Sequence, residues 1–588
     1  MPLINLHWLT IIGGVMAATL LLLVPEVVRA RGGRSAPARA VLRAADALAF
    51  PARVISLLHT GDVRMHVLCA VVGAALLCAG FGRVPWPDTP PVVEATSTAP
   101  SPAAADHVEI TATWPQLVLV ATAVLGLLAK VALRDRAFVP VLVLMFASLA
   151  AAAALLVHLY DPLASQWHDM MGLMRLDPLA VLGQTALLAV AAVMVAAALF
   201  ALSDMAGRRV DLLVTLVLAV VGATVAVAST DMLTLYTGLA LMSVCNVILL
   251  GMASGDPAAT EAAMKYFLAT MTAFGLLLFG TALLYAAVGD TQYDGIADGL
   301  ARLIAVQRGP TRLASAGLAL VIAGMAMLIG LVPFHMHLPD ACQGAPAAVV
   351  GFAVSVPAIA AVFVLVRLLM GPLAAVGHIA RPFLLLLGIG SLVVGSLATV
   401  VQSDPRRMIG HLGVALAGVV ICLIVGISAH LAGGQGMPYA HEALALTLLM
   451  AIALPAGGGI AAAALHGTRL DMPSPDARAA ARRTIASGPV FIGAMACLGL
   501  AAALLHAAGP GRFIDMPSIP RWTAVAALVL AASRLTILFW RLSAKPSAPV
   551  PASAKVRSTA ILLTLIVVAV AAALCAGYVI NAVTAMWP

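Results

Sequence analysis

The sequence predicts an all-α polytopic membrane protein with about sixteen transmembrane helices, on three observations. Of its 588 residues, 62% are hydrophobic and 10% are charged, and the mean hydropathy is +1.06. Ordinary soluble domains carry about a quarter charged residues. Apolar runs of about 20 residues, the length that crosses a bilayer, follow one another along the chain. One of these runs is interrupted by proline and by ionisable residues.

The basic balance of the chain does not indicate nucleic-acid binding. The net charge is +8 and the pI is near 9.4, but the arginines lie mainly in short loops, where they set membrane orientation. The seven cysteines are scattered without a C-x-x-C pair, so neither a disulfide framework nor an iron–sulfur or zinc site is indicated. They are expected to pack as small apolar side chains.

Residues 1–110 form the first predicted domain, an N-terminal extension with two transmembrane helices and a linker. Positive charges crowd after the first apolar run, at Arg29, Arg31 and Arg34. This order favours an uncleaved helix whose N-terminus lies outside. A second span at 64–82 leads into 86–107, which is rich in Pro, Ala, Thr and Ser and is predicted to be a flexible linker.

Residues 111–588 form the second predicted domain, with about fourteen spans. They are expected near 114–133, 138–160, 178–203, 210–228, 232–252, 263–288, 313–345 (broken), 346–370, 383–402, 408–430, 441–465, 487–507, 522–541 and 558–583. When the loops between these spans are assigned alternately to the two sides of the membrane, most loop arginines and lysines fall on the same side. The positive-inside rule identifies that side as cytoplasmic. A loop with Arg302, Arg308 and Arg312 is the exception. This predicts a multi-pass protein of the cell (inner) membrane with both termini on the outer face.

The broken span, 323–346, is the most informative stretch of the chain. Gly330 and Pro333 weaken the helix, and Pro339 is expected to delay its recovery, so the break is predicted from Val332 to Pro339. Four polar residues follow Pro333 closely: His335, His337, Asp340 and Gln343. Hydrocarbon tolerates freed backbone and ionisable groups only where they face protein or water, and discontinuous helices of this kind occur on ion pathways.

Four motifs in order carry a family resemblance. Residues 333–346, P-F-H-M-H-L-P-D-A-C-Q-G-A-P, resemble P-F-H-x-W-x-P-D-x-Y-x-G-A-P of the antiporter-like subunits of NADH-quinone oxidoreductase (complex I), most closely the subunit N type. Residues 231–243, 260–268 and 401–411 are similar to the family's D-L-L-T-L-F-x-G-L-E-L-x-S, E-A-A-L-K-Y-F-L and V-Q-x-x-x-K-R-x-L-A-Y. The resemblance covers roughly residue 114 to the C-terminus and implies the family's fold of about fourteen helices.

The chain departs from this family at the residues that relay protons. Where the family has a Glu, this chain has Ala240, and where the family has two lysines, it has Leu328 and Ala358. Residues 497–511 correspond to a late helix of the family but lack its usual Pro pair and Lys. Only four lysines occur in the chain, at positions 130, 265, 545 and 555. In such a relay, burial lowers the pKa of a Lys and a nearby carboxylate restores it, so the pair can pass a proton. Because this chain has apolar side chains at those positions, the usual charge relay is missing. We therefore expect little or no proton current by the family's usual route.

Five residues remain as proton-path candidates, and three of them have a stated structural alternative. His335 and His337 titrate near physiological pH, but His335 is also suited to cap the broken helix by a hydrogen bond. Lys265 lies about one turn inside its span and is expected to snorkel to the surface. His411 follows two arginines and is expected to be a solvated residue at a helix start. His506 completes the set, which water would have to connect.

The resemblance implies a non-catalytic membrane subunit of a redox-driven translocase, with other membrane subunits and the lipid bilayer as partners. No phosphate loop, dinucleotide fingerprint or nucleophile elbow occurs, so no cofactor is expected on this chain, and flavin, iron–sulfur clusters and NADH are expected on partner subunits. Two alternatives stay open. One is a free-standing or Mrp-like cation/proton antiporter, and the other is a non-transporting scaffold subunit.

Overall fold

The structure is a computed structural model that describes residues 110–159, 169–198, 208–252, 257–307, 311–345, 347–402 and 405–432. The predicted two-helix extension, the spans beyond 432 and His506 lie outside the described residues. The described part is helical apart from one antiparallel hairpin, β1 (Asp169–Met170) and β2 (Met174–Arg175).

Ten long helices match the spans predicted for this region. They are α4 (Trp114–Leu133), α5 (Phe138–Leu159), α6 (Pro178–Ala198), α7 (Arg209–Ala228), α8 (Met232–Leu250), α9 (Pro257–Val288), α11 (Arg312–Ile329), α13 (Ala347–Met370), α14 (Gly377–Val401) and α15 (Pro405–Ala432). Among the described residues, eight helices are long and apolar enough to cross a membrane, and α14 and α15 contribute shorter apolar segments. The protein is therefore a multi-pass membrane protein, whereas the total of about sixteen spans stays a prediction.

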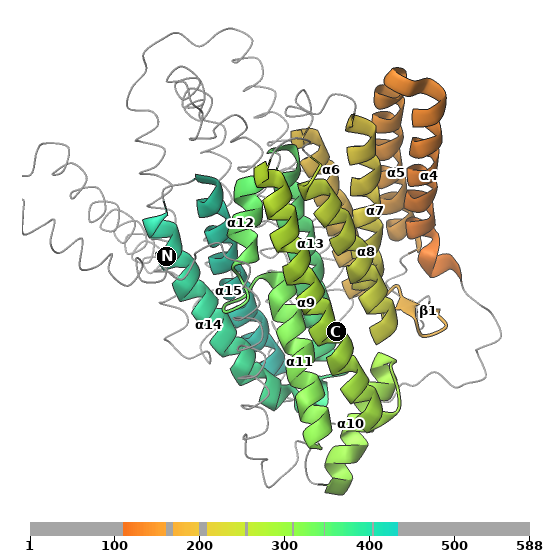
Figure 1. The fold of residues 1–588 in the computed structure, drawn as a ribbon. Coiled ribbons are helices and arrows are strands. Elements are labelled where there is room, and N and C mark those ends of the chain that lie inside the picture. The colour runs from red at the N-terminus through yellow and green to blue at the C-terminus, as the bar shows by residue number, and fades with distance from the viewer. Residues whose placement is uncertain are drawn as a thin grey trace, which may run out of the picture.

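The helices lie side by side in one bundle, with α4 and α5 at one edge and α14 and α15 at the other (Figure 1). The apolar windows of α4 and α5 are only 28% and 33% buried, and side chains such as Val131 and Leu128 point outward. The window of α13 is 94% buried. Because apolar side chains are favoured against lipid, α4 and α5 are suited to a lipid-facing edge, and α13 forms the centre of the core.

Helices α7 and α8 approach closely through small residues. A Cβ atom on Gly222 would lie 2.5 Å from the backbone nitrogen of Met242, and one on Gly238 would lie 2.7 Å from that of Ala226. Small residues at such crossings let two membrane helices pack backbone against backbone. The contact fixes which side of α8 faces α7.

The segment around Arg302 is a helix and not the loop that was expected. Helix α10 (Tyr293–Gln307) buries Tyr293, Ile296, Leu300 and Ile304, which are spaced three to four residues apart. Asp294, Asp298 and Arg302 alternate with them and keep the segment too polar for a membrane span. The remaining described elements are short: η2 (Ile110–Thr113), η3 (Arg134–Ala137), α12 (His337–Gly344) and η5 (Ala374–Val376).

Candidate functional site

The predicted break in the membrane helix is present between α11 and α12. Helix α11 ends at Ile329, and Gly330 follows in the left-handed conformation with φ +83°. The chain is helical again from His337. The expectation that Pro339 delays recovery is wrong, because Pro339 lies in the first turn of α12, where no backbone N–H is needed for the helix.

The freed backbone groups of the break find partners inside the protein. Leu331 N donates to Ala326 O at 2.8 Å, and Phe334 N donates to Leu331 O at 2.7 Å. Val332 N donates to the hydroxyl of Ser391 in α14 at 2.8 Å. A non-helical segment at membrane depth needs such partners, so α14 is part of what holds the break in place.

Both histidines of the break are buried, each 3% exposed. The Nδ1 of His337 lies 3.1 Å from Phe334 O, and its ring stacks edge-to-face on Tyr266 of α9 with centroids 5.7 Å apart. His337 therefore makes a bond to the backbone of the break like the one expected of His335; the capping role of His335 itself stays a prediction.

His411 is buried in α15, only 2% exposed. The expectation of a solvated residue is therefore wrong. The physical reason is that α15 packs on α12: a Cβ atom on Gly410 would lie 2.5 Å from the Cα atom of Pro339. The start of α15 is thus covered by the helix that follows the break.

Four charged side chains, Glu261, Lys265, Asp340 and Arg407, meet beside the break, and we call them the ion-pair cluster. Lys265 Nζ lies 3.1 Å from Asp340 Oδ2 and 2.5 Å from Glu261 Oε1. Arg407 Nη2 donates to the other carboxylate oxygen of Asp340. The side chains of Lys265 and Asp340 are 9% and 5% exposed. Asp340 thus accepts from two cations and joins α9, α12 and α15.

The expected snorkelling of Lys265 is wrong, because its ammonium group is held by two carboxylates. Asp340 was noted as a polar residue of the break but not as a site residue. Its partner lies 75 positions away in the sequence, so helix periodicity carried no sign of the pairing. The one available signal was that a carboxylate buried in a membrane protein needs a cation.

The three positions where the resemblance predicts relay residues lie in different helices. Ala240 is partly buried in α8, Leu328 is buried in α11, and Ala358 lies beside Pro357 in α13. None of these side chains can carry a proton. The described residues also hold no group of three or more His, Cys, Asp or Glu side chains that could bind a metal ion.

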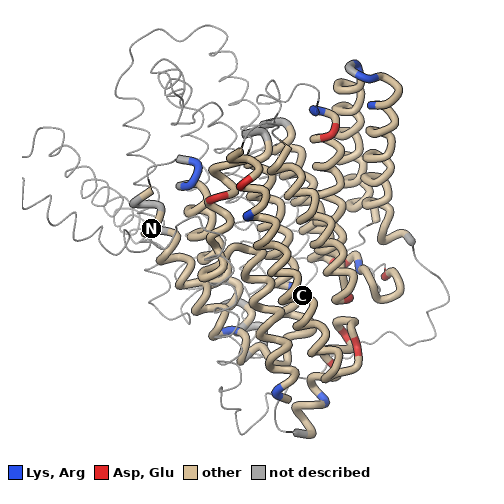
Figure 2. Tube along the Cα trace, viewed as in Figure 1, with Lys and Arg blue, Asp and Glu red and all other residues tan. Residues whose placement is uncertain are grey.

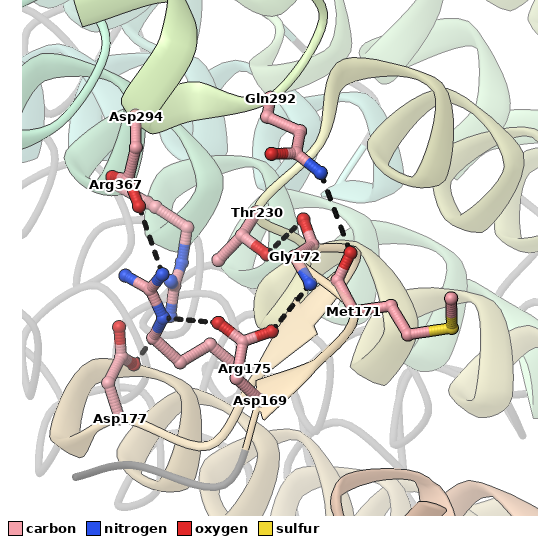
Figure 3. Close-up of polar contacts among 9 residues, drawn as sticks. All are labelled: Asp169, Met171, Gly172, Arg175, Asp177, Thr230, Gln292, Asp294 and Arg367. Atoms are coloured by element: carbon pink, nitrogen blue, oxygen red, sulfur yellow. Dashed lines mark hydrogen bonds and ion pairs between the residues drawn. The ribbon is translucent and has the colours of Figure 1, made fainter. Parts of the chain in front are cut away.

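A second polar network lies at the opposite end of the bundle, around the β1–β2 hairpin (Figure 3). Arg175 Nε lies 3.0 Å from Asp169 Oδ2, and Arg175 Nη2 lies 3.0 Å from Asp294 Oδ2 of α10. Arg367 Nη2, near the end of α13, lies 2.6 Å from Asp177 Oδ1. The network fastens the hairpin to α10 and α6 to α13.

Two groups at this end have shifted pKa values. Burial lowers the pKa of Arg175, but its ion pairs and hydrogen bonds with Asp294 and Asp169 outweigh this effect and raise the pKa above its usual value. Burial raises the pKa of Tyr293 to about 12. Its hydroxyl lies 3.3 Å from that of Ser229. Both groups therefore keep their protons at physiological pH.

Aspartates at the starts of two helices act as N-terminal caps. Asp231 Oδ2 accepts from the backbone nitrogens of Leu233 and Thr234 at 2.8 and 3.0 Å. Asp177 Oδ1 accepts from Ala180 N at 2.7 Å in addition to its ion pair with Arg367. A carboxylate at a helix N-terminus satisfies free N–H groups and interacts well with the helix dipole.

A membrane bundle with a broken helix, a buried Lys–Asp pair and a paired arginine defines an antiporter-like transmembrane domain. Comparison with known proteins agrees. Residues 229–454 match the family described as NADH:quinone oxidoreductase/Mrp antiporter, transmembrane. The match begins just before α8 and includes the break and the whole ion-pair cluster. The family resemblance stated from the motifs is confirmed.

One similar curated protein is the NADH-quinone oxidoreductase subunit N of Laribacter hongkongensis, 40% identical over 224 residues. These residues make up 37% of this chain and 45% of the relative. The chain therefore matches about half the length of such relatives.

Two solved structures share the fold. A chain of respiratory complex I from Thermus thermophilus, in a structure with bound aureothin, has a TM-score of 0.54 and 21% identity, covering 80% of this chain and 99% of that one. A chain of the Mrp complex from Dietzia sp. has a TM-score of 0.60 and 16% identity, covering 81% and 97%. At these identities the likeness concerns the fold alone.

Proposed function

We propose that this chain works as a membrane-embedded, subunit N-like component of a NADH-quinone oxidoreductase of the complex I type. The observation that supports this most is the family match over residues 229–454, which contains the broken helix and the ion-pair cluster. The relatives named as subunit N give the closer assignment within the family. The full domain then has about fourteen helices, preceded by a two-helix extension, in the cell (inner) membrane.

Within that assembly the ion-pair cluster acts mainly as a clamp. Lys265 is paired with two carboxylates, and Asp340 is shared by two cations on different helices. Removing one member of a buried ion pair leaves an uncompensated charge, so such pairs hold their elements in one arrangement. The clamp fixes α12 between α9 and α15 and keeps the break in its observed shape.

Other subunits of the complex carry the redox chemistry in this proposal. Flavin, the iron–sulfur clusters and the NADH site belong to partner subunits, and this chain contributes membrane helices packed against theirs. The alternatives are an Mrp-like cation/proton antiporter, favoured by the shared fold with the Mrp complex, and a scaffold subunit without transport.

The assembly test is purification of the tagged full chain in mild detergent with identification of the chains that accompany it. We expect NADH-oxidising and iron–sulfur subunits to co-purify, and deletion of the gene to lower membrane NADH-quinone activity. Accompanying Mrp-type subunits, or a chain that runs alone with unchanged NADH-quinone activity, would contradict the proposal.

A second test concerns the proton route, which we propose is not conducting in its usual form. Arg replaces the charge of Lys265 but does not release its proton in proteins, so Lys265→Arg with His335→Ala removes relay capacity at both positions while the charge at 265 is kept. We expect redox-driven proton uptake by vesicles that contain the assembly to stay at the wild-type ratio of protons to electrons. A clear loss in the double variant would show that the chain conducts by a rewired route.

A further inference from the structure

Helix α8 carries two buried polar side chains that have no hydrogen-bond partner among the residues that the structure describes. Ser243 and Asn246 are both 0% exposed. The hydroxyl of Ser243 and both polar atoms of the Asn246 amide lack a hydrogen-bond partner. Buried polar groups are nearly always hydrogen-bonded, because leaving them unpaired forfeits the bonds they would make with water.

The two side chains share one side of α8. At 3.6 residues per turn, positions three apart lie on the same side of a helix. Gly238 and Met242 mark the side that packs on α7, and Tyr236 marks another, since its ring lies 5.4 Å from that of Phe274 in α9. Asn246 falls between these two sides, and Ser243, two turns after Tyr236, lies at the edge of that region toward α9. Helix α13 contacts both α7 and α8, so it is the neighbour expected on the side that carries Asn246.

Other buried polar side chains of the bundle are satisfied differently. The hydroxyls of Thr224, Thr270 and Ser355 donate to carbonyl oxygens of their own helices at 2.9, 2.9 and 2.5 Å. Serine and threonine in membrane helices commonly bond in this way. Ser243 does not, so its hydroxyl is available to another group.

The buried amides of Gln116 and Gln184 differ from that of Asn246 because they bond to each other. Gln116 Nε2 of α4 donates to Gln184 Oε1 of α6 at 2.8 Å. The two atoms left over, Gln116 Oε1 and Gln184 Nε2, are an acceptor and a donor on adjoining side chains. Each of these two amides therefore makes one bond to the other amide. The amide of Asn246 makes no such bond among the described residues.

We propose that Ser243 and Asn246 form a buried water-binding site between α8 and α13. Full burial excludes a macromolecular ligand, and α8 has no charged residue within Met232–Leu250 to balance a bound ion. Water is small and neutral, and a buried water makes about three hydrogen bonds to otherwise unsatisfied groups. Serine and asparagine together supply donors and acceptors for it.

The proposed site lies near one end of α8. Asn246 lies four residues before the end of α8 at Leu250, a distance of about 6 Å along the helix. Helix α9, which carries Lys265, begins at the same end. The water site goes beyond the proposed function and does not depend on it.

Radiolytic hydroxyl-radical labelling of the purified full chain in nanodiscs tests the proposal. A pulse of radiation makes radicals from bound water, which oxidise side chains beside it even when they are buried. Met242 is 0% exposed and borders the Asn246 side of α8, and Met325 in α11 is also 0% exposed and serves as the control. We expect Met242 to oxidise at least several-fold faster than Met325.

The variant Ser243→Ala, Asn246→Leu removes the polar atoms. We expect its Met242 to oxidise at the slow rate of Met325, and Ser355→Ala, which removes a hydroxyl bonded to its own helix, to leave the rate unchanged. A high-resolution map of the same sample checks the result, with density for water beside Asn246 in the wild type alone. Equal slow oxidation of Met242 and Met325 in the wild type, with Asn246 bonded directly to protein in the map, would overturn the proposal.

Discussion

At the scale of single residues, Asp340 accepts from Lys265 of α9 and from Arg407 of α15, so both cations beside the break depend on one carboxylate. The position of Lys265 near the start of its span follows from the sequence, and the interfacial role expected from that position is wrong. The reason is that Asp340 comes from the break, whose path in space no periodicity specifies. The same holds for His411, whose burial depends on the approach of α12. By contrast, Asp177 and Asp231 cap backbone groups three positions away, so their role depends only on local structure.

The ion-pair cluster yields a prediction about stability. Lys265→Met keeps the length of the side chain and removes the charge, which leaves Asp340 with Arg407 alone. We expect a loss of about 1–3 kcal/mol of unfolding free energy, less than for a fully unpaired charge because one partner stays. Lys265→Arg, which keeps the charge, should lose less. Denaturant unfolding in micelles measures both.

A double-mutant cycle isolates the pair. Asp340→Asn and Lys265→Met together should cost less than the sum of the two single changes, because the second change removes a charge that the first deprived of one of its two partners. Strict additivity would mean that the two groups do not interact in the folded protein.

At the scale of elements, the sequence predicts the long helices and the break, and it misses two short helices. Apolar runs of full membrane length are strong signals, so the bounds of α4, α7 and α8 agree within a few residues. Helix α12 was missed because Pro339 was expected to keep the chain non-helical after the break. Proline is, however, tolerated in the first turn of a helix. Helix α10 was missed because Asp294, Asp298 and Arg302 interrupt its apolar residues, a pattern of partial burial and not of a span.

Gly330 offers a test of how the break is built. Its φ of +83° is a conformation that residues with a Cβ atom rarely adopt. We expect Gly330→Ala to lower the unfolding free energy by about 1 kcal/mol through backbone strain alone, since the nearest atom to the new Cβ, Leu338 Cδ2, would lie at an ordinary 3.5 Å. Thermal unfolding of the purified chain measures the loss.

Gly275 supplies the matched control for this substitution. It lies inside α9, and a Cβ atom there would meet nothing within 4 Å. Gly275→Ala should raise stability by about 0.5–1 kcal/mol, because alanine restricts the unfolded chain and favours helix. If both substitutions shifted stability in the same direction, backbone strain at Gly330 would not be what shapes the break.

At the scale of the whole molecule, the order of helices along the chain defines two ends of the bundle, and charges collect near them (Figure 2). Helix α7 begins beside the Lys130–Asp211 pair, α8 returns from the other end, and α9 begins again near the first. The ion-pair cluster therefore shares an end with Arg136, while Arg302 lies with the hairpin network at the opposite end. The sequence predicted this separation of charges, but not which helices are neighbours, because helix contacts join segments far apart in the chain.

We expect the two ends of the bundle to face opposite sides of the membrane. Arg136 in η3 and Arg302 in α10 are both exposed and lie outside the membrane-spanning helices. By the positive-inside rule, Arg136→Cys should react with a membrane-impermeant thiol reagent only in inverted vesicles, and Arg302→Cys only in right-side-out ones. The wild-type chain controls for its own cysteines, of which Cys245, Cys342 and Cys422 are buried. Reversed accessibility of the two sites would invert the orientation. Labelling of both sites from one side would contradict the assignment of the two ends, because the helices between them, α5 to α9, would then cross the membrane an even number of times.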